Sequence, residues 1–248
     1  MRLAGAGFVA ADDEARELCE RAAGDAELLE SLVARRLTGE PLAWITGRVS
    51  FCGLVLEVEP GVYVPRAQSE ALAWRAVSRL PAAGTAIDLC TGSGAIAATL
   101  RAHRPAARVV ASDVDAQAVA CALANGVEAY AGDLFGPLPA GLEGAVDLVV
   151  GVVPNVPTPD LGLLQRDPFT LESPQANHGG GDGTAVLRRV VDEARRFLMS
   201  GGALLLELGG GQADLLGDEL ARLGYGDVAV LRDEDDDARG IEATWAPA

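Results

Sequence analysis

A glycine turn between an apolar run and a run of small residues is the part of this sequence best suited to bind a ligand. From Ala86 to Ala98, apolar residues precede Gly92 and Gly94, and alanine-rich sequence follows them. This order predicts a strand, a tight turn and a helix, with the turn close to a ligand at the carboxyl end of the strand. Glycine permits that approach because it has no Cβ, and the free N–H groups at the helix start favour an anionic group.

Three acids extend this predicted site. Asp88 lies shortly before the turn, Asp113 ends the next apolar run, and Asp133 stands in a Gly-Asp-Leu sequence after a further short run. A ribose-binding carboxylate is expected at the position of Asp113. The turn is compatible with a nicotinamide dinucleotide or with S-adenosylmethionine. The acids favour S-adenosylmethionine, which has an ammonium group to pair with them and no pyrophosphate.

Alternating strands and helices are predicted to position these residues. The expected strands cover residues 85–89, 108–112, 127–131, 146–150 and 203–208. The expected helices cover residues 94–103, 116–125 and 184–198. Such alternation predicts an α/β fold with a mostly parallel sheet covered by helices on both faces. Ligands bind such sheets at the carboxyl ends of the strands.

The residues before this alternation predict a smaller helical module. Two amphipathic helices are expected, one after Asp12 and one after Gly24, and both are too short to bury their apolar faces alone. The alternation of Leu54, Leu56 and Val58 with polar residues then indicates a hairpin strand. We therefore expect a helical N-terminal domain for substrate recognition, a β-hairpin linker and a ligand-binding domain, at residues 1–50, 51–66 and 67–248.

The composition narrows the class of protein. The formal net charge is −16 and the chain has no lysine, so nucleic-acid binding is not expected, because an acidic surface repels phosphate backbones. The four cysteines form no pair with metal-ligand spacing, so we predict no metal site and expect them to be buried thiols. We see no signal peptide and no apolar run approaching the ~18 residues of a membrane helix. We expect a cytoplasmic protein without membrane contact.

Five segments spread over nearly the whole chain carry recognisable motifs: Arg35–Leu42, Phe51–Leu54, Pro60–Arg66, Asp88–Ile96 and His178–Gly183. Together they resemble the HemK/PrmC family of protein-(glutamine) N-methyltransferases, and most closely its divergent PrmC-related members. The resemblance implies a class I, Rossmann-like domain that uses S-adenosylmethionine and releases S-adenosylhomocysteine.

The resemblance also implies roles for individual residues. Asp113 would hold the ribose hydroxyls, because a carboxylate can accept from both at once. Asp133 and Leu134 would contact the adenine, and Val114 would cover its other face. Cys90 is expected to act through its backbone. The full cofactor-binding set implied is Asp88, Cys90, Thr91, Gly92, Ser93, Gly94, Asp113, Val114, Asp133 and Leu134.

The expected acceptor site departs from the family's pattern. The family carries Asn-Pro-Pro-Tyr after its fourth strand, where this chain has Val152, Val153, Pro154 and Asn155. In the family the Asn side chain and a nearby carbonyl hold the nitrogen of the substrate glutamine, and valine can neither donate nor accept. These four residues are predicted to bind the substrate, with Pro154 and Asn155 as the candidate catalytic positions. The chain also has Ala-Gln-Ser-Glu at 67–70, where the family usually has Pro-Glu-Thr-Glu.

Three hypotheses follow for the function. The first is an S-adenosylmethionine-dependent N-methyltransferase whose acceptor has changed, to another peptide or protein or to a small metabolite. The second is a true release-factor glutamine methyltransferase that tolerates the altered motif. The third is a non-catalytic interaction protein that binds S-adenosylmethionine. The intact glycine turn argues against loss of cofactor binding, and the altered motif favours the first hypothesis over the second. The sequence predicts no oligomeric state.

Overall fold

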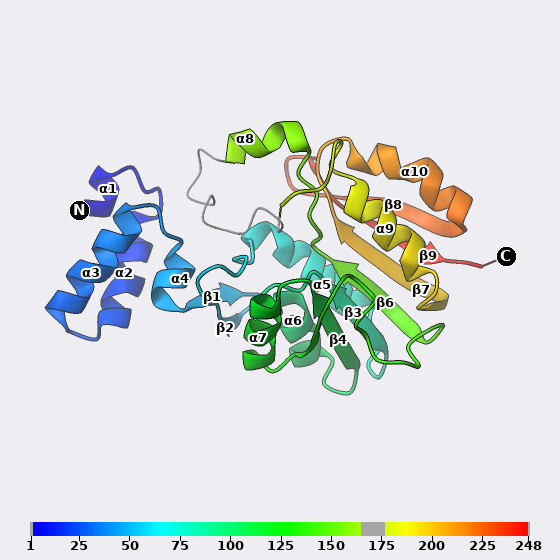
Figure 1. Cartoon of the computed structure of the whole chain (residues 1–248), viewed down its shortest axis with the longest axis horizontal. Helices are drawn as coiled ribbons and strands as arrows, with labels where there is room; N and C mark the ends of the chain where they lie inside the picture. Colours follow the sequence, from blue (N-terminus) through cyan, green and yellow to red (C-terminus); the bar gives the residue numbers. More distant parts are fainter. Residues whose placement is uncertain (1, 165–176, 248) are drawn as a thin grey trace.

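The computed structural model describes residues 2–164 and 177–247 and is built around a seven-stranded sheet (Figure 1). The strand order is β5-β4-β3-β6-β7-β9-β8. The strands are β3 (Thr85–Leu89), β4 (Arg108–Asp113), β5 (Glu128–Ala131), β6 (Val146–Gly151), β7 (Leu198–Glu207), β8 (Tyr225–Arg232) and β9 (Ala238–Trp245). Strands β3 to β7 pair in parallel, whereas β9 is antiparallel to both β7 and β8. The predicted α/β fold with a mostly parallel sheet is confirmed.

Helices cover both faces of this sheet (Figure 1). Helices α5 (Glu70–Arg79), α6 (Ala95–His103) and α7 (Ala116–Ala124) pack on one face, and α9 (Ala185–Ala194) and α10 (Gln212–Leu223) pack on the other. In β3, Ala86 joins the core beneath α5 and α6, whereas its neighbour Ile87 joins the core beneath α9 and α10. Because both faces are buried, the central strands β3, β4 and β6 carry apolar residues on both faces rather than on one.

The strand order changes direction at β3. The chain runs from β3 outward to β4 and β5, and β6 then returns to the other side of β3. The loops that follow β3 and β6 therefore leave the sheet in opposite directions and part from each other at its carboxyl edge. The predicted glycine turn and the predicted acceptor residues follow these two strands.

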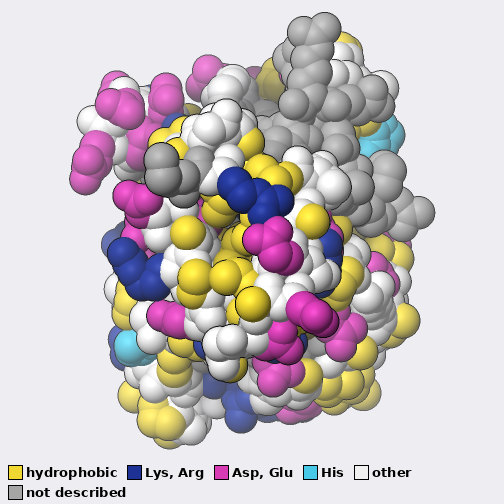
Figure 2. All heavy atoms as spheres, turned by 90° about the vertical axis from the view of Figure 1, so that its left-hand side faces the viewer, with side chains coloured by type: hydrophobic (Ala, Val, Ile, Leu, Met, Phe, Trp, Pro, Cys, Tyr) yellow, Lys and Arg dark blue, Asp and Glu magenta, His cyan; other side chains and the backbone are white. Residues whose placement is uncertain are grey.

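A separate helical module lies at the N-terminal end, on the left of Figure 1. It comprises α1 (Arg2–Gly5), α2 (Ala11–Ala22), α3 (Ala26–Leu37) and α4 (Leu42–Thr46). Leu18, Leu32 and Ile45 form its own small core. Figure 2 looks onto this end of the molecule and shows acidic side chains interspersed with arginines and apolar side chains. The expected burial of the cysteines is wrong for Cys19 in α2, which is exposed.

The linker begins with a hairpin of β1 (Arg48–Phe51) and β2 (Leu54–Glu57). Its turn residues Cys52 and Gly53 both have positive φ, 49° and 77°, as two-residue hairpin turns require. The predicted linker at 51–66 thus starts inside the hairpin, and residues 62–64 form no strand. The outer limits of the predicted domains, residues 1 and 248, lie outside the described residues.

A tryptophan joins the helical module to the sheet domain. Trp44 of α4 is buried, and its indole Nε1 donates to the carbonyl of Val62 at 2.9 Å. Its ring packs in one cluster with Ala118 and Cys121 of α7. Asn125, directly after α7, adds a second tie, since its amide donates to the carbonyls of Glu57 and Ser93 at 2.9 and 2.8 Å. The linker is therefore fixed against the glycine turn.

The late part of the chain differs most from the sequence prediction. The predicted helix 184–198 ends at Ala194, and Leu198 already begins β7. The sequence indicated strand candidates on both sides of the acidic run Asp233–Asp237 but gave no bounds for them; these strands are β8 and β9. The remaining elements are short: η1 (Ala67–Ser69), η2 (Thr158–Asp160) and α8 (Leu161–Leu164). Among the described residues, no helix combines the length and apolarity needed to cross a membrane.

Candidate functional site

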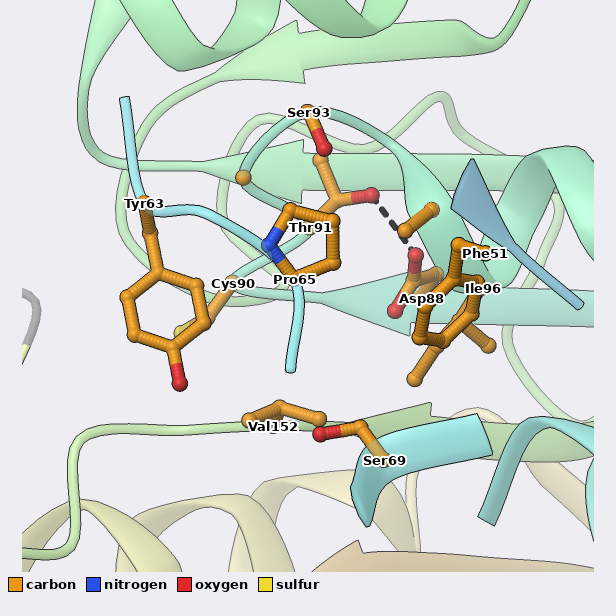
Figure 3. Close-up of a pocket in the computed structure, with 12 residues that line it drawn as sticks. Phe51, Tyr63, Pro65, Ser69, Asp88, Cys90, Thr91, Ser93, Ile96 and Val152 are labelled. Carbon is orange, nitrogen blue, oxygen red and sulfur yellow. Dashed lines mark hydrogen bonds between the residues drawn. The ribbon is translucent and has the colours of Figure 1, made fainter. Parts of the chain in front are cut away.

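A pocket opens at the carboxyl ends of β3 and β6, where the strand order changes direction (Figure 3). Its walls come from the hairpin, the linker, η1, the glycine turn, the start of α6 and the residue after β6. The lining residues are Phe51, Tyr63, Pro65, Ser69, Asp88, Cys90, Thr91, Gly92, Ser93, Ala95, Ile96 and Val152. The predicted cofactor turn and the predicted acceptor residue Val152 thus face one pocket.

Asp88 holds the glycine turn in shape. It is 1% exposed, and its Oδ2 accepts from Thr91 Oγ1 at 2.6 Å and from the backbone N–H of Ala97 at 3.1 Å. These bonds tie the turn to the first residues of α6. Burial raises the pKa of Asp88 to about 7, although the hydrogen bonds from Thr91 and Ala97 act in the opposite direction.

This raised pKa predicts a pH-dependent stability that Asp88→Asn should remove. An unfolded Asp titrates near ~3.9, so the free energy of unfolding contributed by the protonated group is complete below about pH 4 and is lost as the pH rises to about 7. Asparagine keeps both hydrogen bonds, because a single oxygen accepts them. Urea unfolding at pH 4.5, 6 and 8 should show that the free energy of unfolding of the variant, relative to the natural protein, increases with pH. The difference should level off above about pH 7, at on the order of 4 kcal/mol. Parallel pH profiles for the two proteins would contradict this.

The backbone of the turn adopts left-handed conformations at three positions. Cys90, Gly92 and Gly94 have φ values of 53°, 55° and 82°. A Cβ on Gly94 would lie 3.0 Å from atoms of Ala122 and Val127, so only glycine lets the turn sit this close to α7. Burial raises the pKa of the Cys90 thiol far above its ordinary value, and nearby Asp113 adds to the shift. The thiol is therefore neutral.

The start of α6 leaves hydrogen-bond donors directed at the pocket. Its N-cap is Gly94, which offers no side-chain acceptor, and the first N–H groups of a helix have no partner within the helix. Ala95 and Ile96 bring these groups to the pocket wall. The Ser93 hydroxyl is also buried at the wall and has no hydrogen-bond partner among the described residues. These groups fit a ligand with a carboxylate.

Asp113 lies at the end of β4, next to the turn. Its Oδ2 accepts from the Gly92 N–H at 2.9 Å and its Oδ1 accepts from the Asp115 N–H at 3.0 Å. Burial raises the pKa of Asp113, and the backbone donors of Asp115 and Gly92 offset part of this rise. Each carboxylate oxygen keeps a further lone pair, so Asp113 can accept from two neighbouring hydroxyls.

The other predicted cofactor residues lie beside Asp113 and outside the pocket lining. Leu134 is buried, and its carbonyl accepts from Ser112 Oγ at 2.6 Å. Asp133 is exposed, and both of its oxygens pair with Arg189 of α9, at 3.1 and 2.7 Å; this hydrogen bonding lowers the pKa of Asp133. Val114 is 64% exposed. The structure thus brings the backbone after β5 to Asp113, while the Asp133 carboxylate points to α9.

The four predicted acceptor residues do not all face the pocket. Val152 lines the pocket (Figure 3), whereas Val153 is 2% exposed in the core beneath α9 and α10. Pro154 is half-buried and does not line the pocket. The side chain of Asn155 donates to the carbonyl of Glu207 at 3.4 Å, and its own carbonyl accepts from Gln212 Nε2 at 2.6 Å. Asn155 therefore spans the ends of β6 and β7.

Comparison with known proteins places the chain in a family. A family model described as the methyltransferase small domain matches residues 60–133. A release factor glutamine methyltransferase of Geobacter sulfurreducens is 38% identical over 208 residues, which cover 82% of this chain and 72% of that relative. The chain belongs to the release factor glutamine methyltransferase family.

Two further relatives extend this comparison. A protein of Streptomyces pristinaespiralis named 4-amino-L-phenylalanine/4-methylamino-L-phenylalanine methyltransferase is 38% identical over 190 residues, 71% of this chain and 64% of that relative. The crystal structure of a methyltransferase from Pyrococcus furiosus has the same fold, with a TM-score of 0.59 and 18% identity, and the match covers 88% of this chain and 100% of that one. The predicted class I fold is confirmed.

This family member is an S-adenosylmethionine-dependent methyltransferase. The cofactor supplies a methyl group on a positively charged sulfonium. The groups around the pocket fit it: the donors at the start of α6 and the unpartnered Ser93 hydroxyl suit its carboxylate, and Asp113 suits its ribose. Val152, the first of the predicted acceptor residues, lines the same pocket.

Sequence reasoning did not assign six residues of the pocket: Phe51, Tyr63, Pro65, Ser69, and Ala95 and Ile96 at the start of α6. Three of them belong to the hairpin and linker motifs that resemble the family, and that resemblance was the signal that could have assigned them. Ser69 stands where the family usually has threonine. Its hydroxyl is buried at the pocket wall and, like that of Ser93, has no hydrogen-bond partner among the described residues.

Proposed function

We propose that this methyltransferase acts on an amino nitrogen of a small molecule with an apolar body, rather than on a glutamine amide. The observation that carries the proposal is Val152 at the pocket wall, where the family's Asn would hold the glutamine nitrogen. An amide nitrogen is a poor nucleophile because its lone pair is delocalised into the carbonyl. It depends on a polar side chain to orient it, and valine supplies none.

The loss of this orienting side chain is expected to slow methyl transfer strongly, which favours an acceptor with a better nucleophile than an amide. Positioning the reacting atoms can contribute roughly 7–11 kcal/mol to methyl transfer. Removing one orienting hydrogen-bond group costs about 10²–10³-fold in rate in comparable sites. The lone pair of an amine, even of an arylamine, is less delocalised than that of an amide, so an amine tolerates the loss better.

The remaining walls support an apolar acceptor. Phe51, Tyr63, Pro65 and Val152 line the pocket together with the glycine turn (Figure 3). Aromatic and aliphatic walls with few polar groups favour a compact, largely apolar molecule. The Streptomyces pristinaespiralis relative, whose name gives an amino-substituted phenylalanine as acceptor, supports such a change of substrate within the family.

Methylation of glutamine in a release factor is the second candidate, because relatives such as the Geobacter sulfurreducens protein carry that name. One experiment separates the two. The purified full chain is incubated with S-adenosylmethionine and either 4-amino-L-phenylalanine or a glutamine-containing release-factor peptide, and mass spectrometry follows both methylated products and S-adenosylhomocysteine. We expect the amine to be methylated and the peptide to react at about 1% of that rate or less. Faster methylation of the peptide would overturn the proposal.

A further inference from the structure

A buried carboxylate stands directly beside Val152. Glu207 is the last residue of β7, and the parallel pairing of Gly151 with Leu206 makes Val152 and Glu207 neighbours at the carboxyl edge. Val150 and Leu205 are paired and stand two residues before Val152 and Glu207. Both belong to the core beneath α5 and α6. Since side chains alternate along a strand, Val152 and Glu207 point to this same face, which is the pocket side.

Glu207 lacks the partners that a buried acid normally has. It is 8% exposed, yet among the described residues it forms no ion pair, and its side chain accepts one long hydrogen bond, from Gln68 Nε2 at 3.4 Å. Glu242 provides a direct contrast, since it is equally buried on the same face of β9. It pairs with Arg75 at 2.5 Å and Arg79 at 3.0 Å. A buried carboxylate without such compensation favours a ligand that donates hydrogen bonds or carries positive charge.

The surroundings of Glu207 lead to the pocket. Its partner Gln68 directly precedes Ser69 in η1, and the unpartnered Ser69 hydroxyl lines the pocket. Ser69 and Val152 lie on the same side of the pocket in Figure 3. The acid thus lies next to Val152 and to the Gln68–Ser69 segment, at one side of the pocket.

We propose that Glu207 binds the amino group of the acceptor and takes up the proton released during methyl transfer. This inference rests on the proposed function. The nitrogen forms a bond to the methyl carbon while the methyl–sulfur bond breaks, and sulfur keeps that electron pair and becomes the neutral thioether of S-adenosylhomocysteine. The nitrogen becomes positively charged, and one of its protons passes to the Glu207 carboxylate, which becomes a carboxylic acid.

The base at this position narrows the acceptor to an aromatic amine. A carboxylate is too weak a base to take a proton from an alkylammonium group, which titrates near pH ~10.4. An arylamine is already neutral and nucleophilic at neutral pH, and its methylated ammonium form is acidic enough to give a proton to a carboxylate. The aromatic ring would also suit the walls made by Phe51 and Tyr63.

The test compares Glu207→Gln and Glu207→Asp with the natural chain, using 4-amino-L-phenylalanine as the probe acceptor. Glutamine keeps the size of the side chain and a partner for Gln68, so the variant is expected to fold, and thermal unfolding checks this. We expect Glu207→Gln to lower kcat/KM for the amine about 100-fold. Its affinity for S-adenosylmethionine, measured by calorimetry, should stay within about threefold of that of the natural chain. The residues expected to hold the cofactor follow β3 and β4, whereas Glu207 ends β7. Glu207→Asp should recover part of the rate.

A second readout does not depend on turnover. Binding of the amine to the protein saturated with S-adenosylhomocysteine should weaken in Glu207→Gln and be partly restored in Glu207→Asp. Equal amine binding and equal kcat/KM in Glu207→Gln and the natural chain would overturn the role of Glu207 and leave the proposed function intact. A natural chain that neither binds nor methylates the amine would overturn the proposed function itself.

Discussion

Replacing Asp113 by alanine is expected to weaken binding of S-adenosylmethionine about 1,000-fold. The carboxylate holds the Gly92 N–H at 2.9 Å, and its remaining lone pairs are placed for the ribose hydroxyls. Two hydrogen bonds to a charged group contribute roughly 3–6 kcal/mol, and the middle of that range corresponds to the stated loss. The glycine turn also loses one of its anchors, which adds to the effect.

The measurement is a calorimetric titration with S-adenosylmethionine and with S-adenosylhomocysteine. Asp115→Asn is a matched control, because it removes a negative charge two residues away while asparagine still caps α7 through the N–H of Gln117. The control should bind both ligands within about threefold of the natural chain. An Asp113→Ala variant that remains folded and binds as tightly as the control would exclude Asp113 from the cofactor site.

Restoring the family's polar residues should create glutamine methylation. The double variant Val152→Asn with Asn155→Tyr puts an amide at the pocket wall, where it can orient the nitrogen of a glutamine substrate. We expect methylation of a glutamine-containing release-factor peptide to rise roughly 10²–10³-fold over the natural chain. Methylation of 4-amino-L-phenylalanine should fall at the same time, because the pocket wall becomes polar.

The two single variants show which of the two substitutions causes the gain. Asn155→Tyr alone should change peptide methylation little, since residue 155 does not line the pocket and Val152 still blocks the orienting contact. Val152→Asn alone should give most of the gain. A double variant that binds S-adenosylmethionine normally and leaves the peptide unmethylated would show that the acceptor preference does not depend on this contact.

Most of the sheet could be predicted because its strands are buried on both faces. Apolar residues dominate the runs around Ile87, Val110 and Val149, and turn or helix signals separate these runs. The β8–β9 pair gave a weaker signal, since β8 lies at the edge of the sheet and most of it is exposed. The helix predicted to reach Leu198 was too long because the helical spacing of apolar residues continues past Ala194 to Phe197 and Leu198.

Local sequence by itself determined the cofactor half of this protein. The glycine turn, Asp88 and Asp113 lie within or next to one strand–turn–helix unit, so short-range geometry sets their relation. Together with four further motifs along the chain, this unit identified the family, and with it the fold and the cofactor. Only the tertiary structure brought Tyr63, Ser69, Val152 and Glu207 to one edge of the sheet. Val152 follows β6 and Glu207 ends β7, and the pairing of these parallel strands aligns their carboxyl ends whatever the distance in sequence. Tyr63 and Ser69 come from the linker and η1, which pack at the same edge. The acceptor side of the pocket depends on this alignment of strand ends, which local sequence patterns do not predict.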